Sequence, residues 1–265
     1  MEPLPLWKRR LYLAALTAFF AVAIPLIILF ASGYRLTRGW QIIETGGIYV
    51  HPLSEEGEVF MDDLPAQGMR LRKGLIIQNL TPGAHTAEVR EKGRRGWQKT
   101  VAVRRRMVTE VYPLLFPNEA GLREVQAALE SKREYESVME FFAKRDRREF
   151  LTKEKGDLSV SAEGQKIFGQ WEKEGEPAQF LCGLDVCSGR VLVASFGAPV
   201  RLVEFFPDRP EILIAAAGSE VIVIEIDRRD RQHSEVIFAG EAPEAAVKGG
   251  KIYVRDGHAL YQYVI

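Results

Sequence analysis

Residues 200–217 read VRLVEFFPDRPEILIAAA, and residues 220–230 continue as EVIVIEIDRRD. Two runs rich in Val and Ile are separated by a turn that contains Pro207 and Asp208, and such runs favour strands. Similar units lie on either side, DLSVSAEGQKIFGQW at 157–171 and AAVKGGKIYVR at 245–255. Each unit reads as strand, turn, strand, turn, strand. Their spacing of about 40 to 45 residues is typical of propeller blades.

Residues 156–265 are therefore predicted to form a truncated, propeller-like set of about two and a half four-stranded units. The last unit has no strand left for its outer edge. Closed propellers need about 4–8 blades, so this set would leave apolar faces open. We expect cover from the chain's own helix, from a second copy of the chain or from another protein.

Residues 118–155 are predicted to be a helical connector. Asn118 can cap a helix that begins at Glu119, and apolar residues recur at helical spacing through Phe142. The pattern is amphipathic, which predicts that a helix over about 119–149 packs on a β surface. A partner-binding helix is the alternative.

Residues 33–117 carry short apolar runs separated by turn signals. Six or seven strands in fewer than 80 residues indicate a β-sandwich. The predicted strands lie at 47–51, 58–61, 75–80, 85–90, 100–104 and 109–115.

Within this region, GIYVHPLSEEGEVFMDD followed by LTPGAHTAEVREKGRRGW resembles the PEGA domain family, over about residues 46–116. The residues that carry the resemblance are Gly57, Asp62, Asp63, Leu80, Pro82, Gly83, His85, Gly96 and Trp97. The tetrapeptide that names the family reads EEGE at 55–58, and no Thr-Pro precedes the middle strand. The resemblance implies a small, non-catalytic sandwich found on envelope and surface proteins.

Residues 11–32 contain no charged residue, and a helix of this length spans about 33 Å, enough for a bilayer. Lys8, Arg9 and Arg10 precede the segment, so the positive-inside rule predicts a cytoplasmic tail at 1–10 and an extracytoplasmic remainder. Tyr34 and Trp40 mark the expected outer interface. A cleaved signal peptide is the competing interpretation, although signal h-regions run only about 7–15 residues.

The charge of the chain is balanced overall, with 36 Lys and Arg against 36 Asp and Glu. This argues against the uniformly basic surface of most nucleic-acid binders. The balance is a cancellation, because residues 33–117 hold 13 basic and nine acidic residues, whereas 156–265 hold 11 and 17. We expect the first module to lie near anionic headgroups and the second to face away from them.

The sequence contains no catalytic, metal-binding or cofactor-binding motif, so we predict no enzyme activity and no cofactor. Cys182 and Cys187 are five residues apart and are interpreted either as a disulfide or as two buried thiols. Trp97, Arg228 and Arg229 are candidate binding-surface residues. A core position for Trp97 and a charged loop for the two arginines are the alternatives.

These patterns together predict a single-pass, non-catalytic binding or scaffolding protein of the prokaryotic cell envelope. Its expected partners are the membrane, a second copy of the chain, or an envelope protein or polysaccharide. A membrane-tethered sensor or regulator of envelope state is the alternative. An extracytoplasmic hydrolase would require convergent carboxylates or a His–carboxylate pair in a cleft.

Overall fold

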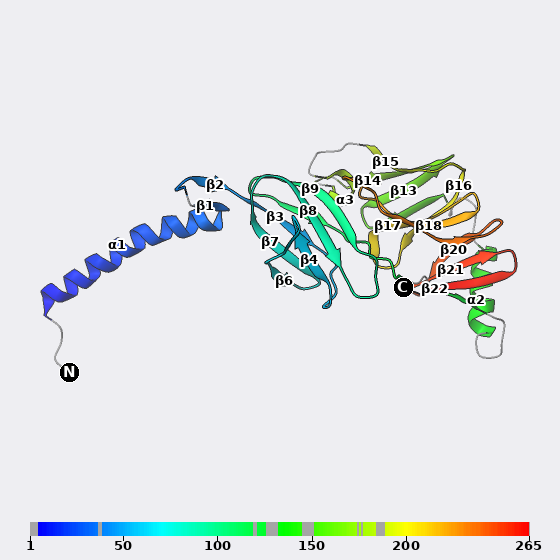
Figure 1. Ribbon diagram of the computed structural model, residues 1–265, viewed down its shortest axis with the longest axis horizontal. Helices are drawn as coiled ribbons and strands as arrows, with labels where there is room; N and C mark the ends of the chain where they lie inside the picture. The colour runs from blue at the N-terminus through cyan, green and yellow to red at the C-terminus, as the bar shows by residue number, and fades with distance from the viewer. Residues whose placement is uncertain are drawn as a thin grey trace.

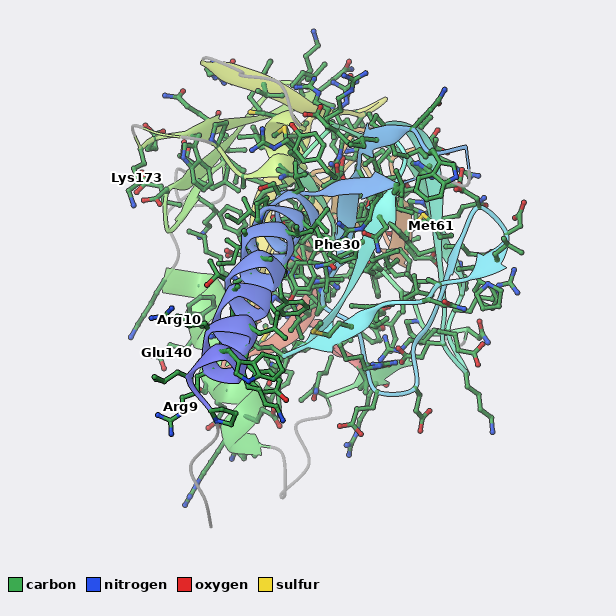
Figure 2. All side chains as sticks on the ribbon, turned by 90° about the vertical axis from the view of Figure 1, so that its left-hand side faces the viewer. Arg9, Arg10, Phe30, Met61, Glu140 and Lys173 are labelled. Atoms are coloured by element: carbon green, nitrogen blue, oxygen red, sulfur yellow. The ribbon has the colours of Figure 1, made fainter. Side chains whose placement is uncertain are left out.

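The computed structural model describes residues 5–36, 39–118, 121–125, 132–144, 151–173, 175, 177–183 and 189–264. A single long helix, α1 (Leu6–Ala31), projects from a body built mainly of strands (Figure 1). Its length and hydropathy suffice to cross a membrane, and none of its residues is buried against the body. The helix begins before the predicted apolar span and includes Lys8, Arg9 and Arg10. Figure 2 views the helix obliquely from its free end, where Arg9 and Arg10 lie, with Phe30 at the other end.

A short hairpin, β1 (Tyr34–Leu36) and β2 (Ile42–Glu44), connects α1 to two four-stranded sheets. The first sheet has the order β10 (Val108–Val111), β3 (Gly46–Val50), β7 (Gly74–Leu80), β6 (Met69–Leu71). The second has the order β5 (Leu64–Pro65), β4 (Glu58–Met61), β8 (Gly83–Arg90), β9 (Trp97–Val103). The predicted strands of this region all overlap observed ones.

The two sheets enclose an apolar core, to which the alternating strands such as β9 contribute one face. Ile48 and Val50 on β3 meet Val89 on β8 and Val101 on β9, and all are almost fully buried. Residues 46–111 therefore form a β-sandwich.

The remaining described strands form three further four-stranded sheets. The first contains β12 (Thr152–Lys155), β13 (Leu158–Glu163), β14 (Lys166–Trp171) and β15 (Arg190–Ser195). The second contains β16 (Val200–Phe206), β17 (Arg209–Ala217), β18 (Glu220–Glu225) and β19 (Ser234–Ala239). The third contains β20 (Glu244–Lys248), β21 (Lys251–Asp256), β22 (Ala259–Val264) and β11 (Gly121–Glu124).

The three sheets pack face to face, with the second sheet in the middle. Leu213 and Ala215 on β17 belong to the core shared with the first sheet. Ile212 and Ile214, the alternate residues of the same strand, belong to the core that contains Ile252 of the third sheet. A strand with two buried faces reads as a continuous apolar run, which is why residues 212–217 contain no polar residue.

The prediction of two and a half units is corrected by β11. This strand pairs antiparallel with β22, Leu122 opposite Tyr263, and completes the third sheet. Residues 121–124 were predicted as helix because their side chains allow one. The open edge of β22 offers backbone groups that a strand satisfies and a helix leaves unpaired.

Helix α2 (Lys132–Lys144) confirms the later part of the predicted helix and covers the outer face of the third sheet. Val138 and Phe142 are buried there against Ala246, Tyr253 and Leu260. The expectation that the chain's own helix covers one open face is therefore confirmed for the third sheet. The predicted helical residues 119–120, 126–131 and 145–149 lie outside the described part of the chain.

Candidate functional site

Strand β9 places two large side chains between the sandwich and the three-sheet module. Trp97, Lys99, Val101 and Val103 alternate onto one face of the strand, and both Trp97 and Lys99 have 0% exposure. A fully buried lysine is rare unless it is paired, so its partners determine what this region does.

Those partners come from the end of β18. Lys99 Nζ donates to Glu225 Oε1 at 2.7 Å and to the Asp227 carbonyl at 2.8 Å, with the Asp227 carboxylate 3.7 Å away. Glu225 also accepts the His233 amide at 2.6 Å and Trp97 Nε1 at 3.3 Å. Burial raises the pKa of Glu225, and Lys99 and the His233 amide offset part of that increase. The Lys99 ammonium and the Glu225 carboxylate are thus both hydrogen-bonded, as the burial of charged groups requires.

Several exposed or half-buried contacts extend this interface. The amide of Thr100 donates to Asp230 at 2.8 Å, and Arg95 pairs with Glu235 at 2.6 Å. Farther along, Arg209 donates to the Pro113 carbonyl at 3.0 Å. These contacts, together with a core cluster shared by both modules, join them into one body.

Beside Lys99 the two modules leave a cleft of about 430 Å³. Its walls come from β9, from the short helix α3 (Gln179–Cys182) and from the loop after β18. The lining residues are Thr100, Val101, Ala102, Arg104, Phe180, Leu181, Cys182, Gly183, Asp227, Arg228 and Arg229. Three arginines and one aspartate are among these residues, and the aspartate, Asp227, is paired with Arg229.

The structure brings the candidate residues Arg228 and Arg229 into this cleft with different roles. Arg229 is half-buried, pairs with Asp227 at 2.7 Å and donates to the Glu110 carbonyl at 2.6 Å. Its buried Nη1 has no hydrogen-bond partner among the described residues. Arg228 is exposed and donates to the Leu192 carbonyl at 2.9 Å. Arg228 is therefore an exposed residue of the cleft wall, whereas Arg229 is held by Asp227 and Glu110.

The prediction that Trp97 belongs to a binding surface is corrected by its burial. Its ring is fully buried and its Nε1 is directed to Glu225, so it holds the modules together and offers no exposed face to a ligand. The alternative core interpretation describes it better.

Cys182 ends α3, lines the cleft and is disulfide-bonded. Cys187 lies outside the described residues, so its pairing with Cys182 stays a prediction.

The sandwich contains a His–carboxylate pair, but both ring nitrogens of its histidine already have partners. His85 Nδ1 lies 2.6 Å from Asp62, and Nε2 lies 2.7 Å from the Thr81 carbonyl. Both ring nitrogens are engaged, which leaves neither to act as a base. Within the described ranges, no group of three or more His, Cys, Asp or Glu side chains is arranged to hold a metal ion.

Lys99 and Glu225 did not emerge from the sequence as functional residues. The available signal was the alternation of side chains along the strand, which places Trp97, Lys99, Val101 and Val103 on the inward face. A lysine on that face indicates a buried partner of opposite charge. The predicted strand at 100–104 began too late to include this pattern.

A scan against protein-family models finds no match to this chain, and no curated protein matches it significantly.

Proposed function

We propose that this chain is a single-pass, membrane-anchored binding or scaffolding protein of the prokaryotic cell envelope, with its β modules outside the cytoplasm and without catalytic activity. The observation that carries the proposal is the joining of an apolar, unburied helix to two β modules that form one body. With α1 as the anchor, this arrangement holds both β modules together beside the bilayer.

Two resemblances support the proposal, and the first of them supports the envelope setting. Residues 46–116 carry PEGA-like motifs on a β-sandwich. The three stacked four-stranded sheets are similar to consecutive propeller blades, with β11 closing the last one from an earlier part of the chain. Both architectures serve as binding scaffolds whose specificity lies in particular surface sites.

The cleft between the modules is the proposed binding site. Its arginines attract carboxylate or phosphate groups, and Phe180 and Leu181 add an apolar wall. We therefore propose an anionic envelope polymer, such as an acidic polysaccharide, as the ligand class.

Membrane orientation is tested with fusions after residue 264 to a phosphatase that is active only outside the cytoplasm. The proposal predicts an active phosphatase, and it predicts low activity when Lys8, Arg9 and Arg10 are all replaced by Glu. Extraction at high pH and the mass of the mature protein report whether the helix stays as an anchor. An inactive wild-type fusion, or a processed soluble protein, overturns the proposal.

Ligand binding is tested with purified full-length protein in detergent, using an oligouronate and a neutral glucan of equal length. The wild type is expected to bind the oligouronate, and Arg228→Gln is expected to weaken that binding about five-fold. Arg72→Gln, at an exposed turn of the sandwich remote from the cleft, serves as the matched control. Equal binding of both glycans, or an equal effect of Arg72→Gln, contradicts an anion-selective cleft.

A further inference from the structure

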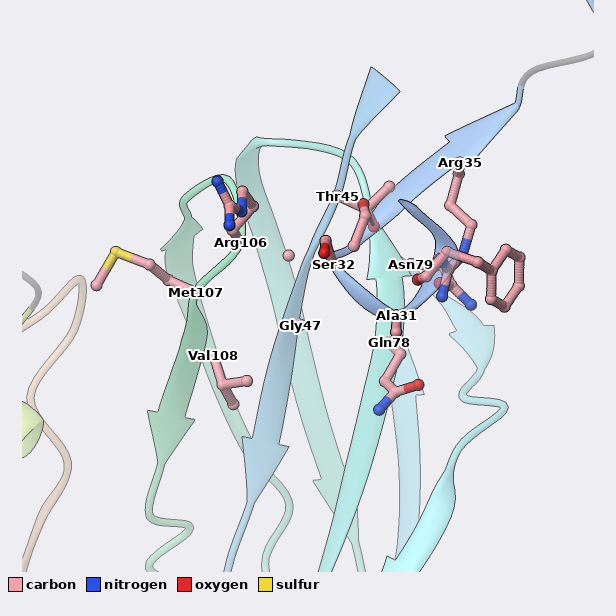
Figure 3. Close-up of a pocket in the computed structure, with 13 residues that line it drawn as sticks. Ala31, Ser32, Arg35, Thr45, Gly47, Gln78, Asn79, Arg106, Met107 and Val108 are labelled. Carbon is pink, nitrogen blue, oxygen red and sulfur yellow. Dashed lines mark hydrogen bonds between the residues drawn. The ribbon is translucent and has the colours of Figure 1, made fainter. Parts of the chain in front are cut away.

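A second pocket, of about 330 Å³, lies where α1 meets the sandwich (Figure 3). It is formed by the end of α1, the start of β3, the end of β7 and the loop 104–107 before β10. The backbone approaches closely here: a Cβ on Gly46 would lie 2.3 Å from the Arg104 carbonyl oxygen. The pocket is thus built by the packing of the loop against β3.

The charge of this pocket is entirely basic. Arg35 and Arg106 are among its 13 lining residues, and none of the 13 is acidic. Figure 3 shows the two arginines on either side of Ser32 and Thr45. Neither guanidinium has a carboxylate within ion-pair distance in the described chain, and the buried Arg35 Nε lacks a hydrogen-bond partner there. The nearby Glu44 is directed to Arg105, at 3.8 Å, and to Tyr34.

Apolar side chains surround the pocket on the same end of the molecule. In the β1–β2 hairpin, Leu36, Trp40 and Ile42 have exposed fractions of 59%, 83% and 62%. Met107 and Val108, which line the pocket, are also about 40% exposed. Exposed Trp and aliphatic residues next to a membrane-crossing helix are typical of the bilayer interface, where apolar and charged groups both find partners.

We infer that this pocket binds the phosphate of an anionic phospholipid headgroup, with Arg35 and Arg106 as the phosphate ligands. The inference rests on the proposed membrane anchoring, because α1 then delivers the pocket to the level of the headgroups. The hairpin residues Leu36, Trp40 and Ile42 insert at the same interface and hold the pocket against it. This assigns the sandwich a lipid-selective contact beyond its role as a scaffold.

The test uses the full-length protein reconstituted in nanodiscs that contain phosphatidylcholine and phosphatidylglycerol. After gentle extraction, native mass spectrometry gives the ratio of the two lipids retained by the protein. The wild type is expected to retain phosphatidylglycerol preferentially. Each arginine replaced by Gln is expected to reduce that preference about five-fold, and the double variant about thirty-fold.

Matched variants separate a built site from general attraction. Arg72 lies at the opposite end of β7, about 20 Å away along the strand, so Arg72→Gln removes one charge without touching the pocket. Because Arg35 also donates to the Phe30 and Tyr34 carbonyls, Arg35→Gln can disturb the junction. Arg106→Gln is therefore the decisive variant, and Arg106→Lys is expected to restore part of the preference.

Three other outcomes would contradict the headgroup site. No lipid preference, an equal loss with Arg72→Gln, or displacement of the lipid by inorganic phosphate alone overturns the inference. Extraction at high pH is measured on the same samples. A protein that leaves the membrane refutes the anchoring itself, whereas a retained protein without lipid preference refutes only the headgroup site.

Discussion

Lys99 is a lysine whose side chain is completely removed from water, where its charge would be hydrated. Its ammonium is completely buried, and it is stabilised by the Glu225 carboxylate and the Asp227 carbonyl of the other module. Removing one partner of such a pair leaves an uncompensated charge, which is costly in a low-dielectric interior. We therefore expect the burial of Lys99 to be tolerated only when the two modules are docked.

We predict that Lys99→Met lowers the free energy of unfolding by about 3–5 kcal/mol at neutral pH. The loss shrinks as the pH falls, because Glu225 takes up a proton and its buried charge disappears. The double variant Lys99→Met/Glu225→Gln is expected to be less destabilised than Lys99→Met alone. Denaturant unfolding of the detergent-solubilised protein measures the free energy of unfolding of the wild type, of Lys99→Met and of the double variant.

Lys92→Met is the control for this prediction, since Lys92 is exposed in a turn of the sandwich. It should change stability by no more than about 0.5 kcal/mol. A Lys99→Met variant as stable as the Lys92→Met control would show that the buried pair does not hold the interface.

Among the secondary-structure elements, α2 depends most clearly on a titratable contact. Glu134 in its first turn accepts hydrogen bonds from Lys251 at 2.8 Å and Tyr253 at 2.6 Å on β21. These bonds hold the pKa of Glu134 below its usual value. The contact therefore stabilises the folded state fully above about pH 4.3, the ordinary pKa of a glutamate. This stabilisation is lost as the pH falls through the lowered pKa of Glu134 in the folded protein.

We predict that amide hydrogen exchange in α2 accelerates in the wild type as the pH falls below about 4, beyond the intrinsic change in exchange rate. Glu134→Gln should make exchange in α2 faster at neutral pH and remove this additional dependence. Glu136→Gln, at an exposed position of the same helix, is expected to behave as the wild type. An identical response of the two variants would argue against docking through Glu134.

At the scale of the whole molecule, the sandwich and the three-sheet module share an apolar core and a buried ion pair. The middle sheet is buried on both faces, so no sheet of the stack can leave without exposing its neighbour. This layering makes the sandwich and the three-sheet module one structural unit, and the cleft has walls from both.

We predict that the sandwich and the three-sheet module unfold together in a single cooperative transition. Calorimetry and the far-ultraviolet circular dichroism of the strands should give the same midpoint. Trp97→Phe, which removes the Nε1 bond to Glu225, should lower that midpoint without splitting the transition. Two separated transitions in the wild type would mean that the modules fold independently.

The parts of the structure that follow from local pattern were predictable from sequence. The apolar run in α1, the alternation of β3, β4, β7 and β8, and the helical spacing of α2 each depend on residues close in the chain. The stacked β units of the second module also follow from their repeated runs of Val and Ile.

What only the tertiary structure decided are the features that depend on distant partners. Residues 121–124 became β11 because β22, some 140 residues later, needed a neighbour for its open edge. Lys99 became buried because Glu225 lies opposite it, and Arg228 and Arg229 became cleft residues because β9 and α3 close the other walls. Local periodicity determines which face of an element is apolar, but the free energy of pairing backbone edges and buried charges is settled only when the elements meet.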